Sequence, residues 1–166
     1  RSESPARTLT LGLVVPDLEN PFFASVTKGV QKRAELSGCS VLVADSDEEA
    51  SQEASLVRTM APHVDGIVLC SPRAEAEEIL ELSRSTRLVL VNRRVEGVPA
   101  VTVDNRDGVR QAIDHLRALG HRRIAIIHAP LGFNFAAQRF AGYVGALEAA
   151  GIARDDSLGA DAPPCS

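Results

Sequence analysis

The sequence predicts a doubly wound α/β fold, in which helices cover both faces of a largely parallel β-sheet. Short apolar runs rich in Val, Leu and Ile alternate with longer amphipathic segments along most of the chain. Glycines follow several of these amphipathic segments, as C′ residues of helices commonly do. Because consecutive parallel strands need a crossover connection, usually a helix, this alternation indicates repeated right-handed βα units.

The first βα unit is predicted for Thr8 to Phe23 and the helix that follows. Its apolar run is bounded by Pro16 and is typical of a strand buried on both faces. Asn20 then stands at the N-cap position and Pro21 at the first helical position, and the helix is expected to end before Gly38. The loop between strand and helix lies at the carboxyl edge of the sheet, where open α/β sheets bind ligands.

The remaining elements follow the same pattern. Further strands are expected at 39–45, 66–70, 87–92, 100–105 and 122–130, and 100–105 could instead be a connection that continues the sheet. Further helices are expected from Ser46 or Asp47 to about Pro62, and at 74–84, 106–119 and 136–150. The tail SLGADAPPCS has no periodicity and is expected to be disordered.

Composition and charge narrow the function classes. The chain has 166 residues, 45% of them hydrophobic, a formal net charge of −4 and a pI of about 5.6, so it offers no field that attracts phosphate backbones. No apolar run approaches the roughly 20 residues that span a bilayer, and the first residues, RSESPAR, contain no apolar signal region. We therefore expect a cytoplasmic protein that does not bind DNA unaided. Of the cysteines Cys39, Cys70 and Cys165, the first two lie in strand-like runs and are interpreted as reduced core residues.

Searches for reactive motifs argue against an enzyme. The sequence lacks GxGxxG after the first strand, GxxxxGK[ST] and GxSxG, and only Asp17 stands near the end of the first strand. The histidines share no metal-ligand spacing with one another or with the cysteines. His128 ends a predicted strand, where it either packs as a structural residue or faces a cleft. No nucleophile, base and orienting group are brought together, so we expect no catalytic residues, metal or cofactor.

Polar side chains stand at the ends of the predicted strands. These are Asp17, Asn20, Asp45, Ser46, Ser71, Asn92, Arg93, Asp104 and Asn105, with Arg139 at the start of the last helix. Phe22 and Phe23 lie beside them, and because neighbouring helix positions point about 100° apart, both rings cannot enter one core layer equally well. Each of these residues has a plain structural explanation, since chains reach water at strand ends and Phe residues pack in cores. Together they suit a sugar, whose hydroxyls bind planar polar groups and whose apolar face stacks on an aromatic ring.

Several segments resemble one known family in order and spacing. They are LGLVVPDLENPFFASVTKGV, VLVADSDEEASQEASLVRTMAPHVDGIVL, LVLVNRR, VTVDN, HLRALGHRRIAII and AAQRFAGYVGALEAAGI. They resemble the effector-binding core of LacI/GalR family transcription regulators, and the resemblance runs from Thr8 to about Leu158. NPFF, VDGI, VDN, LGHRRIA and RxxGY make it specific.

The resemblance implies a type I periplasmic-binding-protein fold, with two Rossmann-like lobes, a small effector in the cleft between them, and a homodimer. It implies an N-terminal lobe at 8–103 and the start of a C-terminal lobe at 104–158, between a linker remnant at 1–7 and a disordered tail at 159–166. The effector-binding residues that it implies are Asn20, Phe22, Phe23, Asn92, Arg93, Asp104 at the first crossover, and Arg139.

Two departures from the family pattern qualify this resemblance. The family often has Asp where this chain has Asn92, and the amide both donates and accepts, so a different hydroxyl partner becomes possible. The family core also continues well beyond this chain, and the N-terminal helix-turn-helix, through which operator DNA would be bound, is absent from it. The sequence therefore predicts a non-enzymatic, dimerising effector-sensing fragment of a repressor, with weak or no effector binding of its own.

Two other functions remain open from the sequence. One is a sugar-binding protein of a transport system, which shares the fold but requires an export signal. The other is a small α/β enzyme in which Asp104, His128 or Arg139 performs acid–base chemistry, which requires convergent titratable groups with perturbed pKa values.

Overall fold

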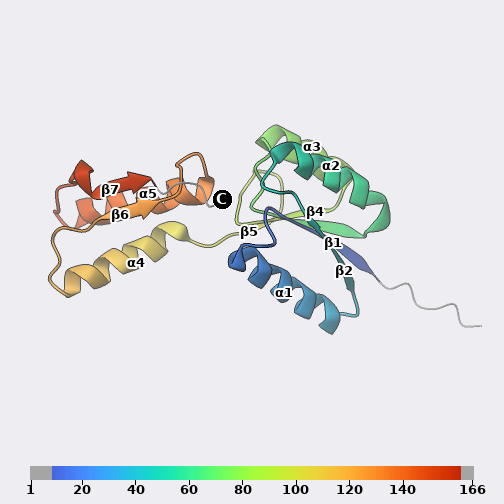
Figure 1. The fold of residues 1–166 in the computed structure, drawn as a ribbon, viewed down its shortest axis with the longest axis horizontal. Helices are drawn as coiled ribbons and strands as arrows, with labels where there is room; N and C mark the ends of the chain where they lie inside the picture. Colours follow the sequence, from blue (N-terminus) through green and yellow to red (C-terminus); the bar gives the residue numbers. More distant parts are fainter. Residues whose placement is uncertain (1–8, 162–166) are drawn as a thin grey trace, which may run out of the picture. The chain divides into compact units, whose positions relative to one another are not determined.

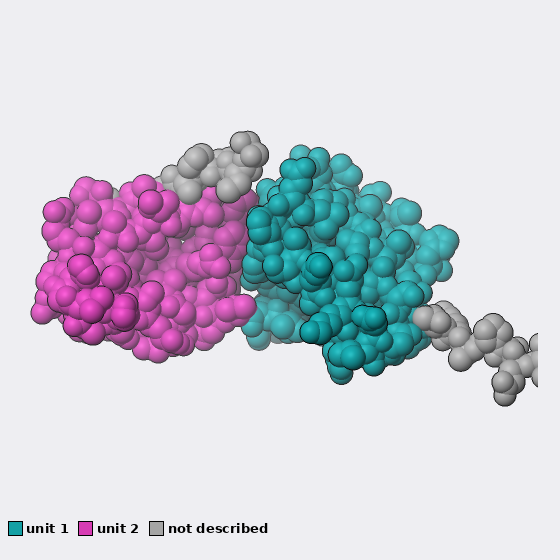
Figure 2. Space-filling model, turned by 60° about the horizontal axis from the view of Figure 1, so that its bottom comes forward, with its two compact units in different colours: residues 1–102 teal, residues 103–166 magenta. Residues whose placement is uncertain are grey.

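The computed structural model describes residues 9–161 and divides the chain into two compact units, residues 1–102 and residues 103–166 (Figures 1 and 2). We call them unit 1 and unit 2. The segment expected to be a linker remnant, residues 1–7, lies outside the described residues, and so do residues 162–166 of the tail.

Unit 1 is a parallel five-stranded sheet of order β2-β1-β3-β4-β5 with helices on both faces (Figure 1). Its strands are β1 (Thr10–Val15), β2 (Ser40–Asp45), β3 (Gly66–Cys70), β4 (Leu88–Val91) and β5 (Ala100–Val101). Its helices are α1 (Pro21–Leu36), α2 (Ala50–Met60) and α3 (Ala76–Ser85), with a 3₁₀ turn at Ala61–His63. The predicted α/β class is confirmed.

Alternation along β1 builds two cores, one on each face of the sheet. Leu13 and Val15 pack with Phe23 of α1 and Cys70 of β3 on one face. Val14 points to the opposite face and joins the larger core beneath α2 and α3. A buried parallel strand needs apolar side chains on both faces, which is why β1 has a continuous apolar sequence.

The start of α1 agrees with the sequence prediction, and the start of α2 does not. Asn20 caps α1, because its Oδ1 accepts the N–H of Phe22 at 3.0 Å. Ser46 or Asp47 was expected to cap α2, but that helix begins later, after Glu49. Asp47 and Glu48 have left-handed φ angles of 52° and 57°, so they form a turn before the helix.

The strand expected at 100–105 is shorter in the structure. β5 consists of Ala100–Val101, and α4 (Asn105–Ala118) begins four residues after Val101. Asp104 is the N-cap of α4, and its Oδ1 accepts the N–H of Asp107 at 2.9 Å. A capping carboxylate satisfies a free N–H at the helix start, so Asp104 ends the extended segment.

Unit 2 packs α4 and α5 (Asn134–Ala149) with a two-stranded parallel sheet, β6 (Ile126–His128) and β7 (Gly159–Asp161). A 3₁₀ turn at Asp156–Leu158 precedes β7. Its core contains Ile113, Ile124, Tyr143 and Leu147. The Tyr143 hydroxyl donates to the Ile124 carbonyl at 2.8 Å, which satisfies a buried polar group.

The end of the chain differs from the expectation of disorder. Residues 159–161 form β7 and pair with β6, so the start of the expected disordered tail is a strand. The strand expected at 122–130 is reduced to β6, which matches the three-residue length of its partner. Pairing with a distant strand supplies backbone hydrogen bonds that local periodicity cannot reveal.

The two described cysteines differ in environment. Cys70 is buried in the core, as expected, and burial raises the pKa of its thiol to about 11. Cys39 lies just before β2 and is half-buried, so the interpretation of Cys39 as a core residue is wrong. Its Sγ lies 3.6 Å from the Ser37 carbonyl, to which it donates.

We expect Cys70 to resist alkylation in the folded protein. The thiolate is the reactive form, and a pKa of about 11 leaves about 0.1% of Cys70 ionised at pH 8, so Cys39 should react far faster. Peptide mapping after timed treatment with iodoacetamide would measure both rates, and both cysteines should react alike in 6 M guanidinium chloride. Equal rates in the folded protein would contradict the buried position of Cys70.

Among the helices of residues 9–161, none has the length and apolarity needed to cross a membrane.

Candidate functional site

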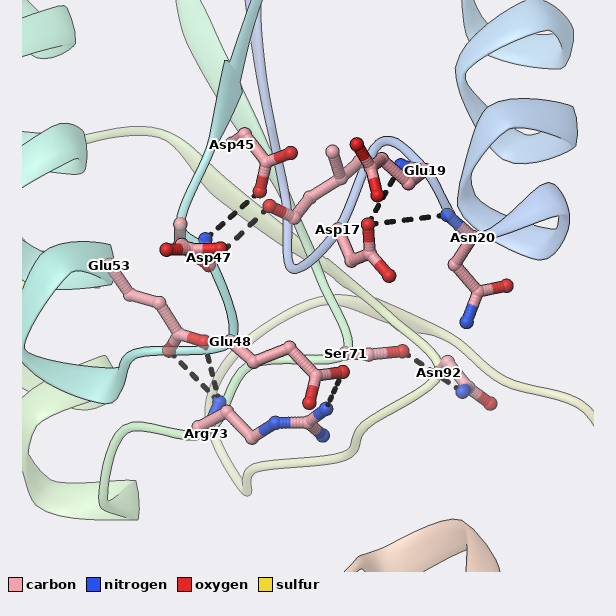
Figure 3. Close-up of polar contacts among 12 residues, drawn as sticks. Asp17, Glu19, Asn20, Asp45, Asp47, Glu48, Glu53, Ser71, Arg73 and Asn92 are labelled. Atoms are coloured by element: carbon pink, nitrogen blue, oxygen red, sulfur yellow. Dashed lines mark hydrogen bonds and ion pairs between the residues drawn. The ribbon is translucent and has the colours of Figure 1, made fainter. Parts of the chain in front are cut away.

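The carboxyl ends of the unit 1 strands meet at one edge of the sheet, where their loops bring polar side chains together (Figure 3). Within the described residues, all four non-glycine residues with a left-handed φ lie at this edge. They are Asp47, Glu48, Ser71 and Asn92. A left-handed φ costs free energy in residues with a Cβ, and such conformations cluster at ligand-binding sites. We call this region the carboxyl edge.

Carboxylates hold the β1–α1 loop at the carboxyl edge. Asp17 Oδ1 accepts the N–H groups of Glu19 and Asn20 at 2.7 and 3.2 Å (Figure 3). Asp45, at the end of β2, accepts the N–H of Leu18 at 2.8 Å. These bonds fix the segment that leads into Asn20 and the first turn of α1.

The two adjacent phenylalanines have different environments. Their rings meet edge to face, with centroids 5.1 Å apart. Phe23 is 7% exposed and belongs to the core, whereas Phe22 is 50% exposed. Phe22 is therefore the ring that is accessible beside the β1–α1 loop, and Phe23 supports it from the core.

Asn92 and Arg93 follow β4 and contact the neighbouring β3–α3 loop. Asn92 Nδ2 donates to Ser71 Oγ at 3.0 Å, so two strand-end side chains are joined directly. Arg93 Nη1 donates to the carbonyl oxygens of Pro72 and Ala74, both at 2.7 Å. The predicted strand-end pair thus lies at the carboxyl edge, with part of the Arg93 guanidinium bound to backbone.

Sequence reasoning missed Glu53, a buried carboxylate behind the same loop. Glu53 is 1% exposed, and its oxygens accept the N–H of Arg73 at 2.8 and 2.9 Å and of Ala74 at 2.9 Å. Burial raises the pKa of Glu53, while these N–H groups and the charges of Arg73 and Arg93 oppose the rise. The available signal was its place on the apolar face of α2, four and seven residues before Val57 and Met60.

A second polar group lies in unit 2, where α4 begins against α5. Asn105 is buried, and its Oδ1 accepts from Arg139 Nε at 2.9 Å while its Nδ2 donates to Gln138 Oε1 at 3.3 Å. The Arg139 guanidinium lies 5.3 Å from the centroid of the Phe135 ring. Phe135 in turn stacks on Phe133, at 5.7 Å between centroids. Sequence reasoning named Arg139 and Asn105 but not these aromatic residues.

The predicted site residues therefore fall into two groups. Unit 1 brings Asn20, Phe22, Asn92 and Arg93 to the carboxyl edge. In unit 2, Arg139 contacts Asn105, and Asp104 caps the helix that Asn105 begins. His128 packs its ring against Phe140 at 5.0 Å between centroids, and it also lines a cavity in unit 2 together with Tyr143 and Arg154, so both interpretations of His128 remain open.

The chemistry of these groups is hydrogen bonding. The carboxyl edge carries amide, hydroxyl, carboxylate and guanidinium groups (Figure 3), and the half-exposed ring of Phe22 belongs to the first turn of α1, which follows the β1–α1 loop. Within residues 9–161, no three or more His, Cys, Asp or Glu side chains cluster in a way that could hold a metal ion. Such a surface, at the carboxyl edge of a parallel sheet, is suited to holding a small polar molecule.

Comparison with known proteins identifies the family. Residues 8–161 match the family described as "Periplasmic binding proteins and sugar binding domain of LacI family", and the chain belongs to it. This confirms the resemblance to LacI-type regulators, and the domain is a LacI-family effector-binding domain.

The similar proteins are named as transcription regulators and repressors. The chain is 31% identical over 140 residues to the ribose operon repressor of Halalkalibacterium halodurans, covering 83% of this chain and 42% of that protein. It is 29% identical over 163 residues to catabolite control protein A of Priestia megaterium, covering 95% and 49%. The crystal structure of a putative ribose operon repressor from Burkholderia thailandensis superposes with a TM-score of 0.84 at 34% identity, covering 93% and 61%. The chain thus spans less than half the length of these two curated relatives.

Proposed function

We propose that this chain is the effector-sensing, dimerising part of a LacI-type transcription repressor. It binds a small molecule, a sugar or a related metabolite, in the cleft between lobes that the family resemblance implies. The observation that carries the proposal is the carboxyl edge, where Ser71 and Asn92 on neighbouring strands are hydrogen-bonded to each other and the half-exposed Phe22 lies two residues after Asn20, in the first turn of α1. Family membership supports it.

The proposed effector contacts come from both units. In unit 1, Asn20 and Asn92 offer amides to hydroxyl groups, Phe22 offers a ring face, and Phe23 holds Phe22 from the core. In unit 2, Arg139 offers its guanidinium, and Asp104 lies beside Asn105, the residue that positions Arg139. Planar polar groups beside an aromatic ring favour a sugar, and relatives named as ribose operon repressors support this class.

Operator DNA is proposed to be bound by a helix-turn-helix domain outside the described residues. A net charge of −4 gives this chain no general attraction for a phosphate backbone, which supports DNA binding by a separate domain. Dimerisation is proposed because β2 and β5 are edge strands, whose outer backbone groups can pair with another copy. The cytoplasm is the proposed location, as transcription regulation requires.

A thermal-shift screen against sugars, sugar phosphates and purines tests the proposal, with the oligomeric state recorded by light scattering. For a ligand at ten times its Kd, stabilisation is about 1.4 kcal/mol, which corresponds to a rise in Tm of about 3–6 °C for a domain of this size. Because binding by this chain alone is expected to be weak, one sugar class should give such a rise only at millimolar concentration, and a rise already at micromolar concentration would contradict that expectation. A folded sample that no compound stabilises would contradict effector binding by this chain.

The Phe22→Ala and Asn92→Ala variants locate the site. Both should lose the sugar-induced rise in Tm, because one removes the stacking surface and the other removes an amide at the carboxyl edge. Leu36→Ala is the matched control, since Leu36 is an exposed apolar residue at the opposite end of α1. An unchanged sugar response in Phe22→Ala and Asn92→Ala would move the site away from the carboxyl edge.

A further inference from the structure

Glu53 places a carboxylate in the interior of unit 1, beneath the β3–α3 loop. A buried carboxylate is costly unless its oxygens are hydrogen-bonded, and Glu53 meets this need with the N–H groups of Arg73 and Ala74 at 2.8–2.9 Å. Both N–H groups belong to the loop that leads into α3. The position of the loop backbone is therefore tied to α2 through a single side chain.

Arg93 holds the same loop by donating hydrogen bonds to carbonyl groups of the loop. A single nitrogen, Nη1, donates to both Pro72 and Ala74 at 2.7 Å. Glu53 thus accepts hydrogen bonds from N–H groups of the loop, and Arg93 donates hydrogen bonds to its carbonyl oxygens. A carboxylate and a guanidinium therefore satisfy the donors and the acceptors of one short backbone segment. Arg73 adds a contact at the surface, where its guanidinium lies 2.6 Å from Glu48 Oε1.

The loop held in this way begins at a residue of the carboxyl edge. Ser71 has a φ of 46° and accepts the Asn92 amide, and Asn92 itself has a φ of 63°. Asparagine tolerates this region, but the left-handed conformation is costly for Ser71, so Ser71 requires support from its surroundings. Arg93 is the next residue after Asn92. The residue that holds the loop carbonyls is therefore joined through the backbone to the residue whose amide contacts Ser71.

We propose that Glu53 and Arg93 are positioning residues that clamp the β3–α3 loop and thereby fix Ser71 and the Asn92 amide at the carboxyl edge. The assignment of this edge to effector binding rests on the proposed function, whereas the clamp itself rests on the contacts above. This gives Arg93 a role through the loop in place of the direct effector contact that the family resemblance implies.

Amide hydrogen exchange and side-chain signals in a ¹⁵N-labelled sample of the full chain test the clamp without any ligand. Glu53→Gln loses one acceptor oxygen and turns an NH₂ group toward backbone N–H donors, so the Arg73 and Ala74 amides should exchange at least about tenfold faster relative to Leu13 and Leu69. The Asn92 side-chain amide signals should move in the same variant. Arg93→Lys should move them too, because the lysine side chain is one bond shorter, so its ammonium nitrogen ends short of the position from which Nη1 donates to both carbonyls.

Matched controls separate the clamp from a general loss of stability. Glu81→Gln removes an exposed carboxylate from α3, and Arg94→Lys changes the exposed neighbour of Arg93, so neither should affect the Arg73, Ala74 or Asn92 signals. Equal acceleration of all core amides, or unmoved Asn92 signals in Glu53→Gln and Arg93→Lys, would overturn the proposal. Because no ligand is used, a clamp that fails leaves the effector screen intact, and a negative screen leaves the clamp result valid.

The wild-type chain gives an independent test if a variant does not fold. The chemical shifts of the Arg73 and Ala74 amide protons should change together as Glu53 titrates. The midpoint of this change should lie above the ordinary pKa of glutamate, because burial raises the pKa of Glu53. The charged groups that act on this carboxylate are the guanidinium groups of Arg73 and Arg93, and Arg73 is paired with Glu48. Amide signals that do not titrate, or that titrate apart, would overturn the assignment of Glu53 to this loop.

Discussion

Gly142→Ala is expected to destabilise unit 2 by about 1–3 kcal/mol, as overpacking in a close helix contact does. A Cβ at this position would lie 2.8 Å from the Arg106 carbonyl oxygen and 2.9 Å from the Arg106 Cα. Both are backbone atoms of the first turn of α4, so no side-chain rotation relieves the clash. The helices would have to separate where α4 and α5 pack together.

Gly145→Ala is the control for this prediction, since it makes the same substitution one turn later in the same helix. A Cβ at Gly145 meets nothing within 4 Å, and alanine has the higher helix propensity, so this variant should gain about 0.4–1 kcal/mol. Urea unfolding of the two variants and the wild type would give the comparison. Equal stability of the two variants would show that α4 and α5 can move apart at Gly142 without loss of stability, which would contradict the prediction.

The close approach at Gly142 also concerns the polar group of unit 2. Arg139 and Gln138 lie one turn before Gly142 on α5, and Asn105 adjoins Arg106 on α4. Separating the helices at Gly142 would therefore lengthen the 2.9 Å bond from Arg139 to Asn105. The glycine of the RxxGY pattern thus has a physical reason for its place beside the arginine.

Much of the fold could be predicted because local signals coincide with the tertiary structure. The helix predicted at 21–37 is α1, with Asn20 as its cap, and the strand predicted at 66–70 is β3. In these segments, apolar periodicity, capping chemistry and burial favour the same structure. The start of α2 was wrong because Asp47 and Glu48 adopt left-handed conformations that their residue types permit but do not demand. β7 was missed because a three-residue strand depends on its partner β6.

The candidate site could be predicted in its residue types but not in its contacts. Asn20, Asn92 and Arg93 could be predicted as residues of this edge from their positions after strands, because a parallel sheet places the carboxyl ends of its strands at one edge. Which of Phe22 and Phe23 is buried depends on which side of α1 faces the sheet, and only the fold determines this. Glu53 was missed because a single charge on an apolar helix face has meaning only when the loop above it is known.

Glu53→Ala is expected to lower the stability of unit 1 by about 3–5 kcal/mol, the cost typical of removing one partner from a buried charged network. The substitution leaves the Arg73 and Ala74 N–H groups without acceptors in the interior, and it also removes packed atoms from beneath the loop. Glu81→Ala, on the exposed face of α3, should change stability by less than about 0.5 kcal/mol. Urea unfolding followed by circular dichroism would measure both.

A double-mutant cycle with Arg93→Ala determines whether the two charges act as one unit. Arg93→Ala leaves the Pro72 and Ala74 carbonyls without their donor, and the loop it frees is the one that Glu53 holds. Once either residue is gone, the loop can move toward water, so the second substitution should cost less than it does alone. We expect a coupling energy of about 1–3 kcal/mol. Additive effects would mean that Glu53 and Arg93 hold the loop independently, and the β3–α3 segment would then be two separate contacts instead of one clamp.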